Sequence, residues 1–436
     1  MFLTYEEAVA WIHARLRLGI KPGLSRMEWM MDRLGHPEKH FHSVHIGGTN
    51  GKGSTVTFLR SILEEQGYSV GTFTSPYFEQ FNERISVNGK PISNDDIVRL
   101  VNVIKPLSDE LEQTELGGPT EFEVITAMSL VFFGQLSSVD IVLYEVGLGG
   151  RFDSTNIINP LLSIITSIGL DHTAILGDTH EKIAFEKAGI IKSGVPIITA
   201  VHQSEALQVI KKKASVENAD CFVLGEEFLV LNHQSIANGE EFDWKMGDQN
   251  WSCIQISMIG KHQIENASLA IMAAHLLNDK SQFVIDSTSI RKGIKKAYWP
   301  GRFEVINNYP TVIIDGAHNE EGIHTLVREV KKRYHDKEIH IVFAALRDKK
   351  LDGMIQELDA IASQITFVSF DFPRAATSKE LYSISLSENK TENMNWETSI
   401  EEQLVHLREN QVLIITGSLY FLAEVKPKLL KLLETM

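Results

Sequence analysis

The stretch HIGGTNGKGSTV, residues 45–56, decides how the first half of this 436-residue chain is interpreted. It follows an apolar run that is typical of a buried strand, and it leads into STVTFLRSILEEQG, which has the periodicity of an amphipathic helix. Glycines in such a turn let backbone N–H groups approach an anion, and the next helix presents its positive end. The sequence therefore predicts a phosphate-binding loop at residues 47–54, with Lys52 as its point charge.

The spacing of this loop departs from the strict G-x-x-x-x-G-K-[ST] pattern. Gly53 follows Lys52 directly, and the hydroxyl residues come only at Ser54 and Thr55. A glycine-rich turn that binds nothing is the alternative interpretation. The strand, the glycines, the lysine and the hydroxyls in one place favour the phosphate loop, with Ser54 or Thr55 near the phosphates or a metal ion.

Apolar runs bounded by Gly or Pro recur along the chain, and amphipathic segments lie between several of them. Runs of this kind are typical of parallel strands buried on both faces, so we expect an α/β fold with a wound, mostly parallel sheet. Residues 221–258 differ, with short β-like pieces that predict a small antiparallel patch beside the main sheet. The runs in the first half are residues 43–48, 68–76, 139–150, 161–169 and 195–201.

A domain junction is expected where Trp299-Pro300-Gly301 interrupts a helical pattern. Beyond it, βα alternation restarts. We therefore predict a large N-terminal domain with a P-loop-type wound sheet at residues 1–298 and a smaller, Rossmann-like α/β domain at residues 299–436. If the strand ends of the two domains face each other, they form a cleft.

The composition excludes several classes of function. The formal net charge is −15, so nucleic-acid binding is not expected, and an anionic ligand needs a locally positive pocket. The chain has two cysteines, which suggests a reducing compartment. No stretch approaches the ~18 apolar residues of a membrane span. We expect a cytoplasmic protein that does not bind membranes.

Polar side chains at the expected strand ends form a second group of candidates. Ser75 offers a hydroxyl ligand for Mg²⁺, although for Ser75 alone termination of a strand before Pro76 is the favoured explanation. Glu145 closes a very apolar strand, where a carboxylate needs a metal ion or a salt bridge to Arg151. His172 could be a ligand or an ordinary polar cap, and Lys187 by default is a solvated helix lysine.

The C-terminal half repeats this arrangement. Asp315 and His318 follow one expected strand, Ser418 follows another, and Arg302 lies just after the junction. Helix capping together with Asn319 is the competing explanation for Asp315. Polar residues at strand ends in both halves favour a binding site over coincidence.

With these residues assembled, the chain resembles the folylpolyglutamate synthases, which in bacteria are often also dihydrofolate synthases and which belong to the Mur ligase superfamily. The resemblance covers essentially the whole length. It rests on HIGGTNGKGS, TSPYFEQFNERI, EVGLGGRFDSTN, SIGLDHTAILGDTHEKIAFEKAGIIK, GKHQIENA, WPGRFE, DGAHNEEG and TGSLYF.

The resemblance implies ATP-dependent amide formation. A folate carboxylate would accept the γ-phosphoryl group of ATP, and the amine of L-glutamate would attack the resulting acyl phosphate. Dihydropteroate is a possible second acceptor, and the family is generally monomeric. The resemblance assigns the triphosphate to Gly51, Lys52, Gly53 and Ser54, and further ATP contacts to Asn266, Arg302 and Asp315.

The resemblance also assigns the metal ion and the other substrates. Mg²⁺ would be held by Ser75, Glu145 and His172, together with Lys187, the lysine that becomes carbamylated in this family. His318 and Ser418 are candidates for the incoming glutamate, and His318 is also counted with Lys52, Lys187 and His172 among the catalytic candidates. The folate or pterin end would meet Ser25, Arg26, Thr120, Glu121, Phe122, Glu123, Phe152 and Asp153.

Two other functions compete with a folate ligase. A Mur-type ligase of peptidoglycan synthesis would carry a nucleotide-sugar domain before the phosphate loop, where this chain has only about 45 residues. A regulatory nucleotide-binding module would leave the second βα domain and the EKAGIIK segment without a role.

Overall fold

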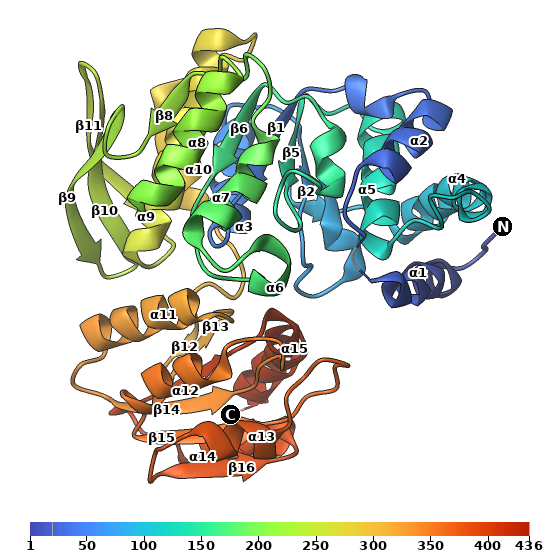
Figure 1. Ribbon diagram of the computed structural model, residues 1–436. Helices are drawn as coiled ribbons and strands as arrows, with labels where there is room; N and C mark the ends of the chain where they lie inside the picture. The colour runs from blue at the N-terminus through green and yellow to red at the C-terminus, as the bar shows by residue number, and fades with distance from the viewer. Residues whose placement is uncertain (20, 436) are drawn as a thin grey trace. The chain divides into compact units, whose positions relative to one another are not determined.

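The computed structural model describes residues 1–19 and 21–435, and these form two compact units (Figure 1). Unit 1 comprises Met1–Ser257 and Lys261–Tyr298. Unit 2 comprises Met258–Gly260 and the chain from Trp299 onward.

Unit 1 is built on an eight-stranded sheet with the order β4-β3-β2-β5-β1-β6-β7-β8. The six strands from β2 to β8 in this order pair in parallel, and β3 and β4 form an antiparallel edge. This confirms the predicted wound, mostly parallel sheet. The strands are β1 (Ser43–Gly47), β2 (Val70–Phe73), β3 (Ile85–Val87), β4 (Lys90–Pro91), β5 (Ile141–Glu145), β6 (Leu162–Ile165), β7 (Ile197–Thr199) and β8 (Cys221–Val223).

Helices cover both faces of this sheet, which is why every residue of β1 and β5 is buried. Figure 1 shows α7 and α8 over one face and α3 behind it. The α3 helix also packs against α9 and α10. The helices of unit 1 are α1 (Tyr5–His13), α2 (Ser25–Leu34), α3 (Lys52–Glu65), α4 (Asn94–Glu112), α5 (Glu121–Val131), α6 (Thr173–Leu176), α7 (His180–Lys187), α8 (Ser204–Val216), α9 (Lys261–Lys280) and α10 (Ser287–Lys296).

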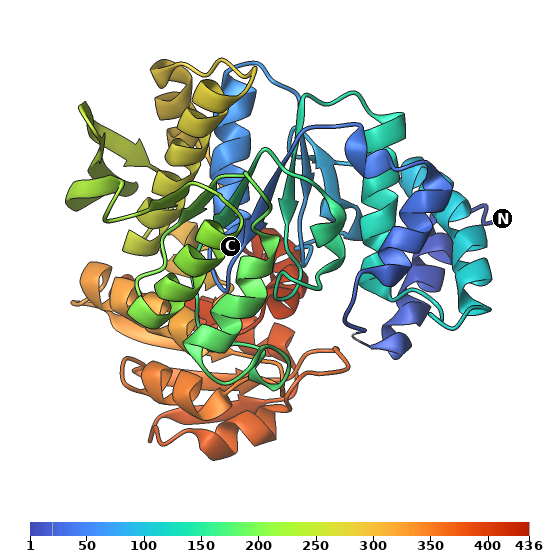
Figure 2. The ribbon, with the colours of Figure 1, turned by 45° about the horizontal axis from the view of Figure 1, so that its top comes forward.

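A separate antiparallel sheet contains β9 (Phe228–Ile236), β10 (Gly239–Met246) and β11 (Gln249–Ile256). Figures 1 and 2 both show it beside α9 and α10. The predicted antiparallel patch is therefore correct for these strands and wrong for its first piece. Cys221–Val223 is β8, which pairs in parallel with β7 and extends the main sheet.

Unit 2 has a six-stranded sheet with the order β12-β13-β17-β14-β15-β16, in which only β12 is antiparallel to its neighbour. This agrees with the predicted smaller α/β fold. The strands are β12 (Glu304–Asn308), β13 (Thr311–Asp315), β14 (Glu338–Phe343), β15 (Gln364–Val368), β16 (Lys390–Asn393) and β17 (Gln411–Thr416). The helices are α11 (Glu320–Arg333), α12 (Leu351–Asp359), α13 (Ser378–Ile384), α14 (Trp396–His406) and α15 (Leu419–Thr435).

The strand order determines where polar loops can meet. In unit 1, the carboxyl ends of β2, β5, β1 and β6 lie next to one another along one edge of the sheet. In unit 2, the same holds for β13, β17 and β14. Ligands of wound α/β folds gather at such edges, so each unit brings the residues after these strands to one edge.

Candidate active site

The loop between β1 and α3 has the geometry of a phosphate loop. Gly51 caps α3 at a φ of 88°, and Gly48 has a φ of 142°. A Cβ on Gly48 would lie 1.9 Å from Oγ1 of Thr166, and one on Gly51 would lie 2.3 Å from Oδ1 of Asn266. Both positions therefore require glycine, and Asn266 of α9 lies against the loop. A contact between Asn266 and ATP stays a prediction.

Two hydroxyl residues that follow β6 hold this loop. Thr166 Oγ1 donates to the carbonyl of Asn50 at 2.6 Å, and the N–H of Asn50 donates to Ser167 Oγ at 3.0 Å. The N–H of Thr49 donates to the carbonyl of Ser167 at 2.9 Å. Neither Thr166 nor Ser167 was predicted from the sequence. Their only signal was a pair of hydroxyls directly after an apolar strand.

Two lysine side chains converge on one carbonyl oxygen of the loop. Lys52 Nζ donates to the carbonyls of Gly48 and Thr49, each at 3.1 Å, and Lys187 Nζ donates to that of Gly48 at 2.9 Å. The two amino groups lie close to one another beside the N-terminus of a helix. They therefore give this part of an acidic protein a local positive charge. An anionic ligand of an acidic protein requires local positive charge of this kind.

Lys187 is buried at the end of α7, with 5% of its surface exposed. The interpretation of Lys187 as a solvated helix lysine is therefore wrong. Burial lowers the pKa of Lys187 to about 7, and the charge of Lys52 lowers it as well, while Asp171 and Asp153 act in the opposite direction. A substantial fraction of this amine is neutral, and hence nucleophilic, near pH 7.

Glu145 ends β5 as a buried carboxylate at the same sheet edge, where its Oε2 accepts the N–H of Ser75 at 3.2 Å. Arg151 forms its ion pair with Glu186 at 2.7 Å, so the alternative of a salt bridge to Glu145 is wrong. Ser75 and Glu145, which the sequence places 70 residues apart, are thus neighbours.

His172 lies at the start of α6 with a φ of 51° and a side chain that is 42% exposed. Its Nε2 is 4.0 Å from the carboxylate of Asp171, whose charge also acts on Lys187. His172 is therefore placed near the same group of charges, with a ring that solvent can reach.

The loop after β5 carries Phe152 and Asp153. The Phe152 ring is 45% exposed, and the guanidinium of Arg151 lies 4.2 Å from its centroid. Asp153 is buried and accepts the N–H of Leu148 at 2.7 Å and that of Thr155 at 3.0 Å. Burial raises the pKa of Asp153, and these hydrogen bonds oppose the shift.

The remaining residues assigned to the folate end form a cluster around α2 and α5. Arg26 Nε donates to both carboxylate oxygens of Glu123, at 2.9 and 3.0 Å, and the pair is buried. Thr120 caps α5, Glu121 lies 3.0 Å from Nδ1 of His13, and Ser25 begins α2. These contacts stabilise the helix packing, and a substrate contact for the cluster stays a prediction.

Phe122 connects this cluster to Gly147, in the loop that follows β5. A Cβ on Gly147 would lie 2.5 Å from Cζ of Phe122, so the ring packs directly on the backbone there. The loop with Phe152 and the helix with Phe122 are therefore adjacent.

Unit 2 presents its own group of predicted residues. Asp315 ends β13, and its carboxylate accepts the N–H of Phe303 at 2.7 Å and that of Ala317 at 2.8 Å. Burial raises the pKa of Asp315, and the charge of Arg302 lowers it. Capping of α11 falls to Asn319, whose Oδ1 accepts the N–H of Gly322 at 2.8 Å, so the capping explanation for Asp315 is wrong.

His318 and Ser418 lie at the same edge of the unit 2 sheet. Nδ1 of His318 lies 2.8 Å from the carbonyl of Gly316. Ser418 is 1% exposed, and its Oγ has no hydrogen-bond partner within the described ranges 1–19 and 21–435. A buried hydroxyl without a partner is costly, so a ligand that accepts its proton would be stabilising.

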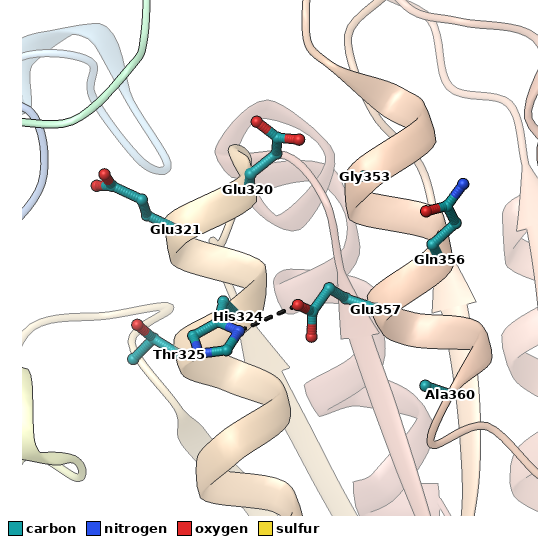
Figure 3. Close-up of a pocket in the computed structure, with 8 residues that line it drawn as sticks. All are labelled: Glu320, Glu321, His324, Thr325, Gly353, Gln356, Glu357 and Ala360. Atoms are coloured by element: carbon teal, nitrogen blue, oxygen red, sulfur yellow. Dashed lines mark hydrogen bonds and ion pairs between the residues drawn. The ribbon is translucent and has the colours of Figure 1, made fainter.

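A groove of about 760 Å³ lies between α11 and α12 of unit 2 (Figure 3). In Figure 3, His324 of α11 reaches Glu357 of α12, and the two are 3.1 Å apart. None of the predicted site residues lines this groove. Its carboxylates, Glu320, Glu321 and Glu357, would repel an anionic ligand.

Arg84 is a further candidate that was not predicted from the sequence. It is 7% exposed, its guanidinium lies 5.2 Å from the ring centroid of Tyr77, and its Nε has no hydrogen-bond partner among the residues described. A buried cation of this kind is suited to an anionic group of a ligand.

The described part of the chain contains no cluster of three or more His, Cys, Asp or Glu side chains suited to a metal ion. The predicted magnesium ligands include only two such residues, Glu145 and His172. A hydroxyl from Ser75 and a modified Lys187 would complete the set. Oxygen ligands of this type are those that Mg²⁺ prefers.

Both units match models of Mur ligase domains. Residues 46–274 match the Mur ligase middle domain, and residues 301–419 match the Mur ligase glutamate ligase domain. The fold and the phosphate loop thus define an enzyme of the Mur ligase class.

Similarity to known proteins identifies the family within this class. A dihydrofolate synthase/folylpolyglutamate synthase of Bacillus subtilis is 49% identical over 98% of this chain and 100% of its own length. A solved structure described as an FPGS–AMPPCP–folate complex is 31% identical with a TM-score of 0.86, over 98% of this chain and 100% of the other. Folylpolyglutamate synthase of Mycobacterium tuberculosis with ADP is 28% identical with a TM-score of 0.88, over 97% and 98%. This chain belongs to the dihydrofolate synthase/folylpolyglutamate synthase family of the Mur ligase superfamily.

In the part of the chain that the structure describes, none of the helices combines the length and apolar character needed to cross a membrane.

Proposed function

We propose that this protein is an ATP-dependent ligase that joins L-glutamate to a folate, and that it also accepts dihydropteroate. The observation that carries the proposal is the convergence of Lys52 and the buried Lys187 on the carbonyl of Gly48, at 3.1 and 2.9 Å, in a glycine loop. The names of the relatives supply the substrates, and the bacterial relative at 49% identity is named for both activities.

The chemistry follows from the substrates. A carboxylate has no leaving group, so the γ-phosphoryl group of ATP is first transferred to its oxygen, giving an acyl phosphate and ADP. The amine of glutamate then attacks the acyl carbon and phosphate leaves. Gly51, Gly53 and Ser54 at the start of α3 hold the triphosphate, and Lys52 neutralises the charge of the transferred group.

We assign Mg²⁺ to Ser75, Glu145, His172 and a carbamylated Lys187, because a carbamate converts an amine into an anionic oxygen ligand. The buried position of Lys187 and its lowered pKa suit the reaction of its neutral amine with CO₂. Bound Mg²⁺ would supply charge neutralisation at the phosphates. Asn266 packs against the loop and is assigned to ATP.

We assign the folate to the Phe152 loop and to Phe122, and the remaining ATP and glutamate contacts to Arg302, Asp315, His318 and Ser418 of unit 2. A cleft between the two domains stays a prediction. We also infer a cytoplasmic enzyme, since Cys221 and Cys253 are free thiols that suit a reducing compartment. The resemblance to a generally monomeric family is the basis for inferring a monomer.

The direct experiment incubates the protein with Mg-ATP, tetrahydrofolate and radiolabelled glutamate, with dihydropteroate in a parallel reaction. We expect label in the folate product and equimolar ADP. Lys52→Ala should lower kcat by a factor on the order of a hundred or more. The matched control is Lys211→Ala. Lys211 is an exposed lysine of α8 that pairs with Glu226, so its removal should leave the rate unchanged. No incorporation with either acceptor would refute the proposed function.

A further inference from the structure

A buried chain of three side chains joins the strand before the phosphate loop to the loop that carries Phe152. Asp153 Oδ1 accepts a hydrogen bond from the hydroxyl of Thr155, and Thr155 Oγ1 lies 2.9 Å from Nε2 of His45 in β1. The exposed fractions of Asp153, Thr155 and His45 are 5%, 0% and 0%. The predicted contact of Asp153 with the folate does not explain its connection to Thr155 and His45.

The direction of the hydrogen bonds follows from counting donors. An ionised carboxylate can only accept hydrogen bonds, so the hydroxyl of Thr155 donates its single proton to Asp153. Thr155 Oγ1 must then accept from His45, which therefore carries its proton on Nε2. In the described part of the chain, Nδ1 of this ring is a buried atom without a partner, as expected for the unprotonated nitrogen of a neutral imidazole.

Asp153 uses its other contacts to close the loop in which it lies. Its Oδ2 accepts the N–H of Leu148 at 2.7 Å, and its own N–H donates to the carbonyl of Gly150 at 3.1 Å. Phe152 is the residue directly before it. The Asp153 carboxylate therefore helps to hold the backbone of residues 148–153, the loop that carries Phe152.

The two ends of the chain differ in rigidity. His45 lies in the middle of β1, which is paired on both sides, with β5 and with β6. The residues that Asp153 closes form a loop that includes Gly149, at a φ of 70°, and Gly150. When the connection is lost, the loop rather than the strand is free to shift.

We propose that Thr155 and His45 are positioning residues that fix the Phe152 loop for the folate substrate by anchoring Asp153 to β1. The inference rests on the proposed function and goes beyond it, since it assigns a role in folate binding to two residues that never touch the substrate. The ATP side should be unaffected, because β1 keeps its place in the sheet.

The test is Thr155→Val, which keeps the shape of the side chain and removes the hydroxyl. We expect the KM for the folate to rise about tenfold, the effect of losing one hydrogen bond to a charged group. The KM for ATP should stay within about twofold of the wild-type value. Thr155→Ser retains the hydroxyl and should keep a folate KM close to that of the wild type. His45→Leu should behave like Thr155→Val, and it provides a second route if the valine variant does not fold.

A double-mutant cycle separates positioning from a general structural effect. If Thr155 acts through Asp153, then Thr155→Val should add less than about twofold to the folate KM in an Asp153→Ala background, which has no side-chain acceptor for the Thr155 hydroxyl. A full tenfold addition would overturn the inference, as would a folate KM that Thr155→Val and His45→Leu leave unchanged. An equal rise in both KM values would show a general structural role instead. A wild-type protein that ligates neither acceptor would refute the proposed function itself, a result distinct from all of these.

Discussion

At the scale of a single residue, the burial of Lys187 lowers the stability of the folded protein but suits the chemistry proposed for its amine. Its pKa is about 7 in the folded protein against 10.5 in the unfolded chain, so between these pH values the unfolded state binds one more proton. Stability therefore rises with pH across this window, and the full penalty is present below pH 7. The difference of 3.5 pKa units corresponds to at most about 5 kcal/mol.

We predict that Lys187→Met abolishes ligation while it raises the free energy of unfolding in CO₂-free buffer. The gain should be largest below pH 7 and should vanish above pH 10.5, where lysine is neutral in both states. Denaturant titrations of both proteins from pH 6 to 10 measure it. Parallel stability curves for the two proteins would contradict the prediction. Restoration of Lys187→Ala activity by short carboxylates would support the carbamate.

Ser418 poses a similar conflict in unit 2, since its buried Oγ lacks a partner in the described residues. We predict that Ser418→Ala raises the KM for glutamate about tenfold and leaves the free energy of unfolding unchanged or up to about 1 kcal/mol higher. Initial rates and denaturant titration measure the two effects. Ser385→Ala is the control, because that buried hydroxyl donates to Asp359 and its loss should destabilise. A Ser418 variant that loses stability but keeps its glutamate KM would contradict the assignment.

At the scale of elements, the phosphate loop depends on close contacts as well as on backbone conformation. Gly48 and Gly67 both have positive φ, 142° and 100°, but only Gly48 has an atom in the way of a Cβ. We predict that Gly48→Ala lowers ATP affinity at least tenfold, because the loop must move away from Thr166. Gly67→Ala should cost roughly 1 kcal/mol of stability and leave ATP affinity unchanged. Titration with a non-hydrolysable ATP analogue measures both, and equal affinities would show that the contact with Thr166 is unimportant.

The elements themselves were largely predictable from the sequence. The runs that became β1, β5 and β6 are continuous and apolar, because helices bury both faces of the sheet. β8 was assigned to the wrong sheet because a strand of three residues carries no information about a partner, β7, that lies about 20 residues earlier. Parallel pairing is a non-local property, and periodicity is local.

The residues of the candidate site could be predicted only where a local sequence pattern indicates their chemistry. Lys52 and the glycines around it have a recognisable pattern, whereas the burial of Lys187 depends on packing that no local pattern encodes. Thr166 and Thr155 are ordinary hydroxyls in the sequence. They gain a role only through partners more than 100 residues away, Asn50 and His45.

At the scale of the whole molecule, the two units each have a core of their own, which makes their contributions separable by experiment. The phosphate loop and Lys187 lie in unit 1, and Asp315, His318 and Ser418 lie in unit 2. Ile259, in the short segment assigned to unit 2, packs against the unit 2 core. A fragment of residues 1–298 lacks this core and would expose Ile259 to solvent, so it should carry Ile259→Ser to stay soluble.

We predict that this fragment binds a non-hydrolysable ATP analogue, because the loop, Lys52 and Asn266 are all present. Its affinity should be roughly 10- to 100-fold below that of the full chain, since the charged contacts assigned to Arg302 and Asp315 are missing. It should form no amide with any folate. The full chain with Arg302→Ala is the control, and it should lose part of the same ATP affinity while it keeps measurable ligation. Calorimetric titration and glutamate incorporation measure both proteins. A fragment that ligates, or that binds the analogue as tightly as the full chain, would show that unit 2 does not contribute to the site, and the catalytic assignments of its residues would then fall together.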